Sequence, residues 1–552
     1  MYPSPLSTYN ICFKMNIIFI LYTTFHCLKP IESLSTKSIN QPYRPYRIGV
    51  IGGGASGMFA ATNAASRLHK YYNTNTNSNN PDHQLNHKKR VEVHVYETTN
   101  TLMSKVLISG GGRCNVLHDT AKPVTTILES YPRGNKELNG LFHKHFTPLD
   151  ARAWFEDRHV VLKTESDGRM FPITDDSNTI MDCIYKDAKE NGVIINTESK
   201  VYEIEKVKRD DDGGDGDDHG DDSSYYFAVK TKTRKLKENA SERTENEQQS
   251  TQNFPLYDCI IMATGSSPMG HEIIRNLNVG HQIVKPVPSL FTFNAAKHQI
   301  KEQGSVLYDL AGLSLKHSKL TLKVAVPGKK KKKIITQEGP LLITHTGISG
   351  PATLRLSAFA AREFHSMNYK TQVMIHWAPE LGSVMEIEEK LWSMTTLNPK
   401  KLISSSYPLT LRGSDSTSSS KNDESSSPLL PRRLWSALVL QSGIEQDRVW
   451  GEAPKKKVNA LARNIAEFAL DVAGKSVFKD EFVTAGGIML KEIKMQTMES
   501  KKCSGLFFCG EVIDVDGITG GFNFMNCWST GYTAGTCAAS TLIDRIETRI
   551  KD

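Results

Sequence analysis

The stretch Arg47-Ile48-Gly49-Val50-Ile51-Gly52-Gly53-Gly54-Ala55-Ser56-Gly57 decides the fold. Arg47–Ile51 is a short apolar run with the character of a buried strand, and Ala55–Leu68 continues as an alanine-rich helix. A glycine-rich turn that leads a strand directly into a helix is typical of the first βα unit of a dinucleotide-binding domain. The sequence therefore predicts an α/β fold that starts at this turn.

Each glycine of the G-x-G-x-x-G pattern has a separate physical role. Gly52 permits the tight turn, Gly54 lets the backbone approach a pyrophosphate, and Gly57 allows the helix to pack close to the strand. Ala55 and Ser56 lie at the start of the helix, where free N–H groups and the helix dipole favour a diphosphate. The alternative is that the glycines only pack a helix against a strand.

An acidic residue at the end of the next strand separates these interpretations. Glu97 follows the apolar run Val91–Tyr96 and lies 97 − 57 = 40 residues beyond Gly57. The usual interval from the first turn is about 20 residues, and subtracting an Asn-rich insertion of roughly 18–20 residues restores it. An acid here accepts hydrogen bonds from a free ribose 2′-hydroxyl, so it favours FAD or NAD over NADP.

Strand and helix patterns alternate on both sides of a central region whose pattern of predicted elements is different. Val91–Tyr96 and Cys259–Ala263 are expected as strands and Thr179–Glu190 as a helix, and the α/β texture returns near Gly505–Cys509. Between them, short β-type runs precede a segment, Arg432–Ala473, that is expected to be helical. A discontinuous nucleotide-binding domain with an inserted module explains this order.

Several polar stretches lack the apolar residues needed to pack a core and are expected as loops or disordered insertions. They are 71–90, 210–253 (in two parts, 210–224 and 230–253) and 404–427.

The charge balance is a weak guide to partners. The formal net charge is +8, but much of the excess lies in the runs Lys329–Lys333 and Lys455–Lys457, which have the character of solvated turns. No helix-turn-helix or RNA-binding signature accompanies them, so we expect no DNA partner, while a tRNA partner stays open. The nine cysteines form no CxxC and no zinc spacing, so we expect no metal site.

The first 45 residues have the features of a targeting segment. Lys14 precedes the apolar run Ile17–Leu28, which is too short to span a membrane but suits a signal peptide. Ser33–Arg47 is Ser-rich and basic with no acid, as in a transit peptide. We expect an organelle, such as a plastid, and no stable membrane insertion once the segment is removed. A mitochondrial or cytoplasmic location, with a start at Met15, is the alternative.

Five segments have motifs of their own. The most specific are Leu107-Ile108-Ser109-Gly110-Gly111-Gly112-Arg113-Cys114-Asn115 and the long tail from Thr484-Ala485-Gly486-Gly487 through Thr497-Met498-Glu499-Ser500 to Gly510-Glu511-Val512-Ile513-Asp514-Val515-Asp516-Gly517 and Gly520-Gly521-Phe522-Asn523. The others are Gly168-Arg169-Met170-Phe171-Pro172, Ile260-Ile261-Met262-Ala263-Thr264-Gly265 and Thr344-His345-Thr346-Gly347-Ile348-Ser349-Gly350-Pro351-Ala352. With these five segments the chain resembles the BaiN/YhiN-like flavoprotein family.

The resemblance implies a Rossmann-like FAD domain interrupted by a β-barrel-like module and a helical module. The expected divisions are 1–45 for targeting, 46–285 and 480–552 for the FAD domain, 286–376 for the barrel and 377–479 for the helices. The residues expected to bind FAD are Gly52, Gly54, Ala55, Ser56, Gly57, Glu97, Ser109, Gly110, Gly111, Gly112, Arg113, Cys114, Asn115, Ala263, Thr264, Gly265, Gly510, Glu511, Asp516, Gly520, Gly521, Phe522 and Asn523.

Some of these positions can also be interpreted from their residue type and neighbours alone. Ser109–Gly112 is expected as a glycine-rich turn after a short strand, where backbone presses against a flat ring or phosphate. Arg113 either stabilises charge near the flavin or forms a structural ion pair. Cys114 is expected to pack against the cofactor rather than act as a nucleophile. The N–H groups of Gly520–Asn523 are expected near the flavin O2 atom.

The resemblance implies a reductase of a small organic substrate, such as one with a C=C bond conjugated to a ketone. Without a second G-x-G-x-x-G after a strand, we expect NAD(P)H to dock transiently and pass a hydride through flavin N5. His345 is the candidate proton donor and Tyr308 a poorer one. A flavin-dependent RNA-modifying enzyme and a non-catalytic flavin sensor are the alternatives.

Overall fold

The computed structural model describes residues 44–74, 91–209, 225–233, 254–302, 305–325, 328, 330–406, 429–476 and 483–551. The expected targeting segment, apart from its last residues, lies outside the described residues, as do 75–90, 210–224, 234–253 and 407–427 of the expected insertions. The chain divides into two units, and the larger, Pro45–Lys208 with Asp218–Asp552, holds every helix and strand described below.

A seven-stranded sheet forms the nucleotide-binding domain, in the order β19-β20-β21-β10-β1-β2-β6. Its strands are β1 (Tyr46–Ile51), β2 (Val91–Tyr96), β6 (Ile194–Asn196), β10 (Cys259–Met262), β19 (Ile493–Lys494), β20 (Glu499–Ser500) and β21 (Leu506–Phe508). β1 pairs in parallel with β2 and β10, and β10 pairs in parallel with β21, so that Ile260 lies opposite Leu506. Segments from the two ends of the chain therefore share one sheet.

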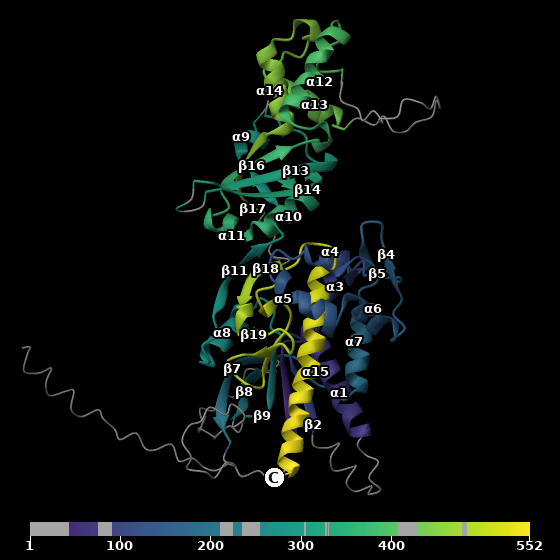
Figure 1. Ribbon diagram of the computed structural model, residues 1–552, viewed down its shortest axis with the longest axis vertical. Coiled ribbons are helices and arrows are strands. Elements are labelled where there is room, and N and C mark those ends of the chain that lie inside the picture. The colour runs from purple at the N-terminus through teal and green to yellow at the C-terminus, as the bar shows by residue number, and fades with distance from the viewer. Residues whose placement is uncertain are drawn as a thin grey trace, which may run out of the picture. The chain divides into compact units, whose positions relative to one another are not determined.

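Two helices from opposite ends of the chain pack side by side on this sheet. They are α1 (Ala55–Thr74) and α15 (Phe522–Lys551), drawn purple and yellow in Figure 1. Small residues allow the approach: a Cβ added at Gly535 would lie 2.2 Å from the carbonyl oxygen of Ala60, and one at Gly531 would lie 2.8 Å from that of Ser56. This contact brings the start of α15 towards the glycine turn.

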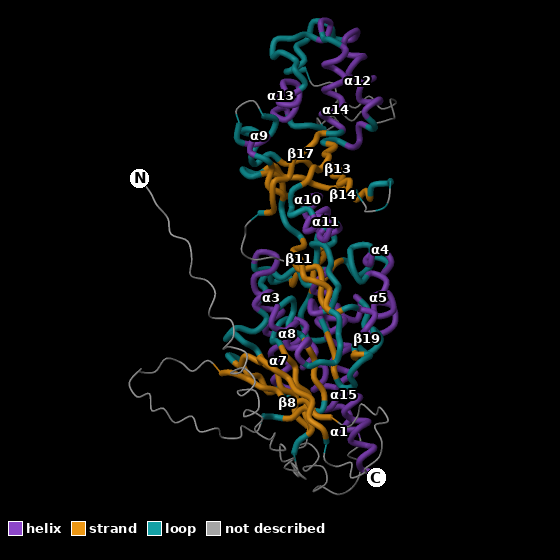
Figure 2. The backbone as a smooth tube through the Cα atoms, turned by 90° about the vertical axis from the view of Figure 1, so that its left-hand side faces the viewer, coloured by secondary structure: helices purple, strands orange, loops and turns teal. Residues whose placement is uncertain are grey.

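A closed barrel forms the inserted module, in the order β12-β15-β14-β13-β16-β17. Its strands are β12 (Phe293–Ala295), β13 (Ser314–Val324), β14 (Lys333–Ile343), β15 (Gly347–Ser349), β16 (Thr371–His376) and β17 (Phe468–Lys475). Helices α12 (Val384–Leu397), α13 (Arg432–Gln441) and α14 (Lys455–Ala466) connect β16 to β17 (Figure 2). The chain enters and leaves the barrel through β11 (Ile283–Ser289) and β18 (Val483–Ile488), which pair antiparallel.

Four local expectations differ from the structure. The end of Arg432–Ala473 is strand β17, because Phe468, Leu470 and Val472 alternate with more exposed residues and fill the barrel. The barrel thus closes inside the range 377–479 that was expected to be helical. β8 (Tyr225–Thr233) includes Lys230 of the second expected insertion, held by ion pairs to Glu203 and Glu205 on β7.

The other two differences concern helices. α1 continues to Thr74, four residues into the expected insertion 71–90, with the Tyr71 hydroxyl donating to the Glu547 carboxylate on α15 at 2.6 Å. The segment before Ser109 is helix α3 (Ser104–Ile108), not a strand.

The remaining elements frame these domains. They are β3 (Leu117–His118), α4 (Val124–Leu128), α5 (Asn135–Gly140), α6 (Pro148–Glu156), β4 (Leu162–Thr164), β5 (Arg169–Pro172), α7 (Asn178–Glu190), β7 (Ser199–Lys208), β9 (Leu256–Tyr257), α8 (Pro268–Asn276), α9 (Lys297–Ile300), α10 (Pro351–Phe359) and α11 (Ala361–Ser366). Within the described residues, no helix has the length and apolarity needed to cross a bilayer.

Candidate functional site

A pocket of about 1800 Å³ lies where the glycine turn, the Ser109 loop, the C-terminal tail and the barrel module meet. Many of the residues expected to bind a cofactor line it. These are Gly52, Gly54, Ala55, Ser56, Glu97, Ser109, Gly110, Gly111, Asn115, Ala263, Thr264, Gly265, Glu511, Gly520, Gly521, Phe522 and Asn523. The fold therefore gathers segments that are more than 450 residues apart in sequence around one cavity.

The glycine turn is packed on one side and open on the other. Gly52 has a φ of +111°, and a Cβ there would lie 2.4 Å from the carbonyl oxygen of Ala263. A Cβ at Gly57 would lie 1.9 Å from the carbonyl oxygen of Gly52, whereas one at Gly54 would meet no atom within 4 Å. Gly52 and Gly57 thus serve strand–helix packing, and Gly54 presents bare backbone to the pocket.

Glu97 is held in place by backbone groups at the end of β2. Its carboxylate accepts hydrogen bonds from the N–H groups of Gly53 and Thr99, each at 2.9 Å. One oxygen therefore fixes the turn and the other fixes the following loop. This leaves lone pairs on an oriented carboxylate that lines the pocket, as recognition of ribose hydroxyls requires.

The Ser109 loop exposes backbone to the same cavity. Gly110 and Gly111 have φ values of +58° and +72°, and a Cβ at Gly111 would meet nothing within 4 Å. Asn115 ties the loop to the tail: with its amide nitrogen towards Leu117, it donates to the Leu117 carbonyl and accepts from the Gly521 N–H, both at 3.0 Å. The N–H of Gly521, expected near the flavin O2, therefore has a protein partner.

Six of the residues expected to bind the cofactor do not line the pocket. They are Gly57, Gly112, Arg113, Cys114, Gly510 and Asp516. Arg113 forms the ion pair that was its alternative, donating to Glu165 at 2.5 Å and Asp175 at 2.8 Å. Burial raises the pKa of the Cys114 thiol to about 12, as expected of a packing residue rather than a nucleophile.

Asp516 is buried in an ion pair of its own. Arg133 donates to both of its carboxylate oxygens, and the Ser289 hydroxyl donates to one of them at 3.0 Å. Burial outweighs these partners and raises the Asp516 pKa. Arg133 also donates to the Ala358 carbonyl at 2.8 Å, so this cluster joins the tail to β11 and α10 rather than facing the cavity.

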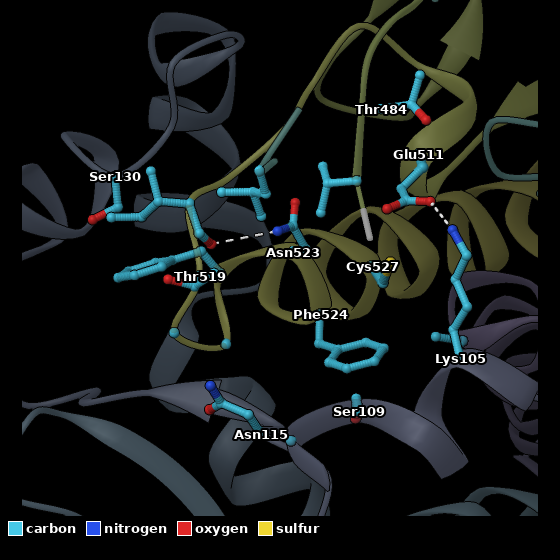
Figure 3. A pocket seen from close by; sticks show the side chains of 18 of the residues that line it. Lys105, Ser109, Asn115, Ser130, Thr484, Glu511, Thr519, Asn523, Phe524 and Cys527 are labelled. Carbon is cyan, nitrogen blue, oxygen red and sulfur yellow. Dashed lines mark hydrogen bonds and ion pairs between the residues drawn. The ribbon is translucent and has the colours of Figure 1, made fainter. Parts of the chain in front are cut away.

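The tail supplies one carboxylate to the cavity. Figure 3 shows Lys105 reaching towards Glu511, and the two are joined by an ion pair of 2.7 Å. In the same view Ser109 and Asn115 lie on one side, and Asn523 and Glu511 on the other. Lys105 belongs to α3, and nothing in its local sequence distinguished it from other lysines.

A histidine that the sequence did not single out lines the pocket instead of His345. His118 on β3 stacks on Phe522 with ring centroids 4.4 Å apart, and its Nδ1 lies 2.9 Å from the Gly520 carbonyl oxygen. A carbonyl only accepts, so Nδ1 carries the proton and Nε2 accepts from Lys122 Nζ at 3.1 Å. Burial, and then the Lys122 charge, lower the pKa of His118. His345 is exposed in the turn between β14 and β15 and does not line the pocket.

The barrel module contributes a further wall. Gln337 and Pro340 on β14, and Leu354, Arg355 and Phe359 on α10, line the cavity there. No sequence signal marked these residues, because their approach depends on how the barrel folds. Among the described residues, no group of three or more His, Cys, Asp or Glu side chains could hold a metal ion.

The cavity suits FAD in shape and chemistry. The bare backbone at Gly54 and Gly111, the oriented carboxylate of Glu97 and the start of α1 match a diphosphate with its ribose. The remaining volume extends to the Ser109 loop and the barrel wall, which leaves room for a flavin ring and a second molecule.

Comparisons with known proteins agree with this reading. The ribosomal RNA dihydrouridine synthase of Haemophilus influenzae is 25% identical over 89% of this chain and 97% of its own length. The 3-dehydro-bile acid delta(4,6)-reductase of Clostridium scindens is 23% identical over 89% of this chain and 99% of its own. The ribosomal RNA dihydrouridine synthase of Escherichia coli is 24% identical over 78% of this chain and 87% of its own.

A family model described as the HI0933-like protein Rossmann domain matches residues 83–214 and 220–537. This confirms the family resemblance and the expected fold class, an FAD-binding Rossmann-like domain with inserted modules. Because the match covers well over half of the sequence, the chain belongs to the HI0933-like Rossmann-domain family of FAD-dependent oxidoreductases.

Proposed function

We propose that the chain reduces a C=C bond conjugated to a carbonyl group. The observation that carries this proposal is a single cavity in which a dinucleotide cradle continues into a wall of the barrel module. The names of the relatives fit one reaction: uridine has a ring C=C bond conjugated to a carbonyl, and so does a 3-keto bile acid with a neighbouring double bond. Both are saturated by adding a hydride and a proton.

FAD, when bound, supplies hydride chemistry at N5. The chain's own residues would bind and orient it. Gly54 with the start of α1 would hold the diphosphate and Glu97 the adenosine ribose. Glu511, oriented by its ion pair with Lys105, would accept hydrogen bonds from the sugar-like chain of the cofactor.

The Lys122–His118 pair is the best-placed source of the proton. Lys122 Nζ points its hydrogen at the unprotonated Nε2 of His118, and both residues line the cavity. The Gly520 carbonyl fixes the tautomer with Nε2 unprotonated, so the ammonium of Lys122, positioned by His118, would carry the donated proton and would then be reprotonated from solvent. His345 is exposed and does not line the cavity, which supports placing the proton source at Lys122 and His118 instead.

NAD(P)H is the proposed source of the hydride. The single glycine fingerprint supports transient docking rather than a dedicated nicotinamide domain. A non-catalytic flavin sensor would show no reduction by any such donor.

Uridine within ribosomal RNA is a second candidate substrate, favoured by the names of two of the relatives. The exposed residues Lys330–Lys332, between β13 and β14, would then contact phosphates. That candidate predicts salt-sensitive RNA binding that is lost when the lysine run is removed.

The test is anaerobic stopped-flow mixing of the FAD-loaded full chain with NADH and with NADPH. We expect at least one to bleach the flavin, and an enone or an uridine-containing ribosomal RNA fragment to restore its colour. Mass spectrometry should then show the gain of a hydrogen pair in that acceptor. Bleaching that no conjugated carbonyl reverses would contradict the proposed reaction.

A further inference from the structure

Two cations in the wall of the cavity, Lys122 and Arg355, have no acidic partner among the described residues, and of these two Arg355 lies on the barrel side. Among the described residues that line the cavity, Lys105 and Arg169 each pair with carboxylates, and Lys122 donates to the imidazole of His118. Arg355 on α10 has no ion pair with any described residue. Its guanidinium is therefore the positive charge that the protein leaves uncompensated on the barrel side.

The hydrogen bonding of Arg355 is also incomplete. Nη1 donates to the carbonyl oxygen of Glu338 at 3.2 Å, while Nε is buried and has no partner in the described part of the chain. The carboxylate of Glu338 does not compensate the charge, since it pairs with Lys319 at 3.1 Å. Nε has no accessible surface, so a ligand in the cavity would be bound through Nη2, which is not buried and has no hydrogen-bond partner among the described residues.

The surroundings of Arg355 indicate the kind of ligand. Leu354, Phe359, Pro340 and Pro351 line the same wall and offer an apolar surface. A guanidinium presents N–H groups in a planar fork that matches the two oxygens of a carboxylate or phosphate. The wall thus combines a flat apolar surface with one oxyanion receptor.

We propose that Arg355 is the anion subsite of the substrate pocket, binding a carboxylate or phosphate carried by a molecule whose apolar body lies against Leu354 and Phe359. This inference rests on the proposed function, because it places the substrate between the flavin position and the barrel wall. It adds that the substrate is an anion, and that Arg355 selects it.

The experiment compares ligand pairs that differ only in charge. The FAD-loaded full chain is titrated calorimetrically with cinnamate and cinnamamide, and with uridine 5′-monophosphate and uridine. We expect one anion to bind at least about tenfold more tightly than its neutral counterpart, the size of one charge-assisted hydrogen bond. The favoured pair identifies the anion as carboxylate or phosphate.

Arg355→Gln should abolish that preference while leaving the neutral ligand's Kd unchanged. Arg355→Lys keeps charge and volume but loses the fork, so it should lose most of the preference and tests the subsite even if the glutamine variant does not fold. Arg463→Gln removes an exposed arginine of α14 outside the cavity and should behave as wild type.

Two results overturn the inference while FAD binding is intact: no preference for either anion in the wild type, or a full preference in a folded Arg355 variant. A chain that takes up no FAD would overturn the proposed function and this inference together, so the two failures are distinguishable.

Discussion

Replacing Gly57 by alanine should destabilise the nucleotide-binding domain. The new Cβ would lie 1.9 Å from the carbonyl oxygen of Gly52 and 3.1 Å from the Cβ of Ala263. The first of these is a backbone atom of a turn that is itself wedged against Ala263, so no side-chain rotation relieves the clash. Overpacking costs about 1–3 kcal/mol of folding free energy. We expect Gly57→Ala to lower the free energy of unfolding by about 3 kcal/mol, because the turn must move as a whole.

Gly54→Ala provides the matched control, since a Cβ there meets no protein atom within 4 Å. Its free energy of unfolding should stay within about 0.5 kcal/mol of wild type. The methyl group would nevertheless stand in the space given to the diphosphate. We expect FAD affinity to fall at least about tenfold, which corresponds to about 1.4 kcal/mol.

Urea denaturation of the two apoproteins measures stability, and FAD titration by flavin fluorescence measures affinity. The account requires the two effects to separate: stability lost at Gly57, affinity lost at Gly54 with stability kept. If Gly54→Ala bound FAD like wild type, the glycine turn would not be where the diphosphate lies.

Three further outcomes follow from the site and its surroundings. Burial raises the pKa of Cys114 to about 12, so iodoacetamide should label it only on unfolding, and rapid labelling of the native protein at neutral pH would contradict this. His118→Asn should lower turnover about 100-fold without slowing flavin reduction, whereas His345→Asn should match wild type. If the two variants lost turnover equally, His118 would have no specific role in proton transfer. Burial lowers the pKa of His281. Burial would raise the pKa of Glu492, but the hydrogen bonds that its carboxylate accepts outweigh this effect and lower that pKa. The unfolded chain then binds more protons, so the free energy of unfolding should fall as pH drops below 6.5 and again below 4.5, and His281→Gln should flatten the first fall in urea titrations.

The sequence predicts the features that depend on neighbouring residues. The strand, glycine turn and helix around Gly52–Gly57 form a local pattern, and Glu97 could be placed because a strand ends beside it. The Ser109 loop and the tail could be named from the family resemblance. That they line one cavity follows from the pairing of β10 with β21, which the parallel-sheet pattern anticipates.

The missed features depend on contacts between distant segments. Arg355 and His118 have no motif, and each gains its role only when β14, α10 or β3 is brought to the cavity. Arg113 lies in the most specific motif yet pairs with Glu165, a contact with a distant segment that no local pattern marks. Strand β17 was hidden because a strand of eight residues directly follows the helical segment α14.

The most direct test of the account is the amount of FAD that the purified full chain holds. The cavity between the glycine turn, the Ser109 loop and the tail predicts a yellow protein that releases one FAD per chain on denaturation. A folded protein that is colourless and takes up no added FAD would contradict the assignment of this cavity and the chemistry proposed for it.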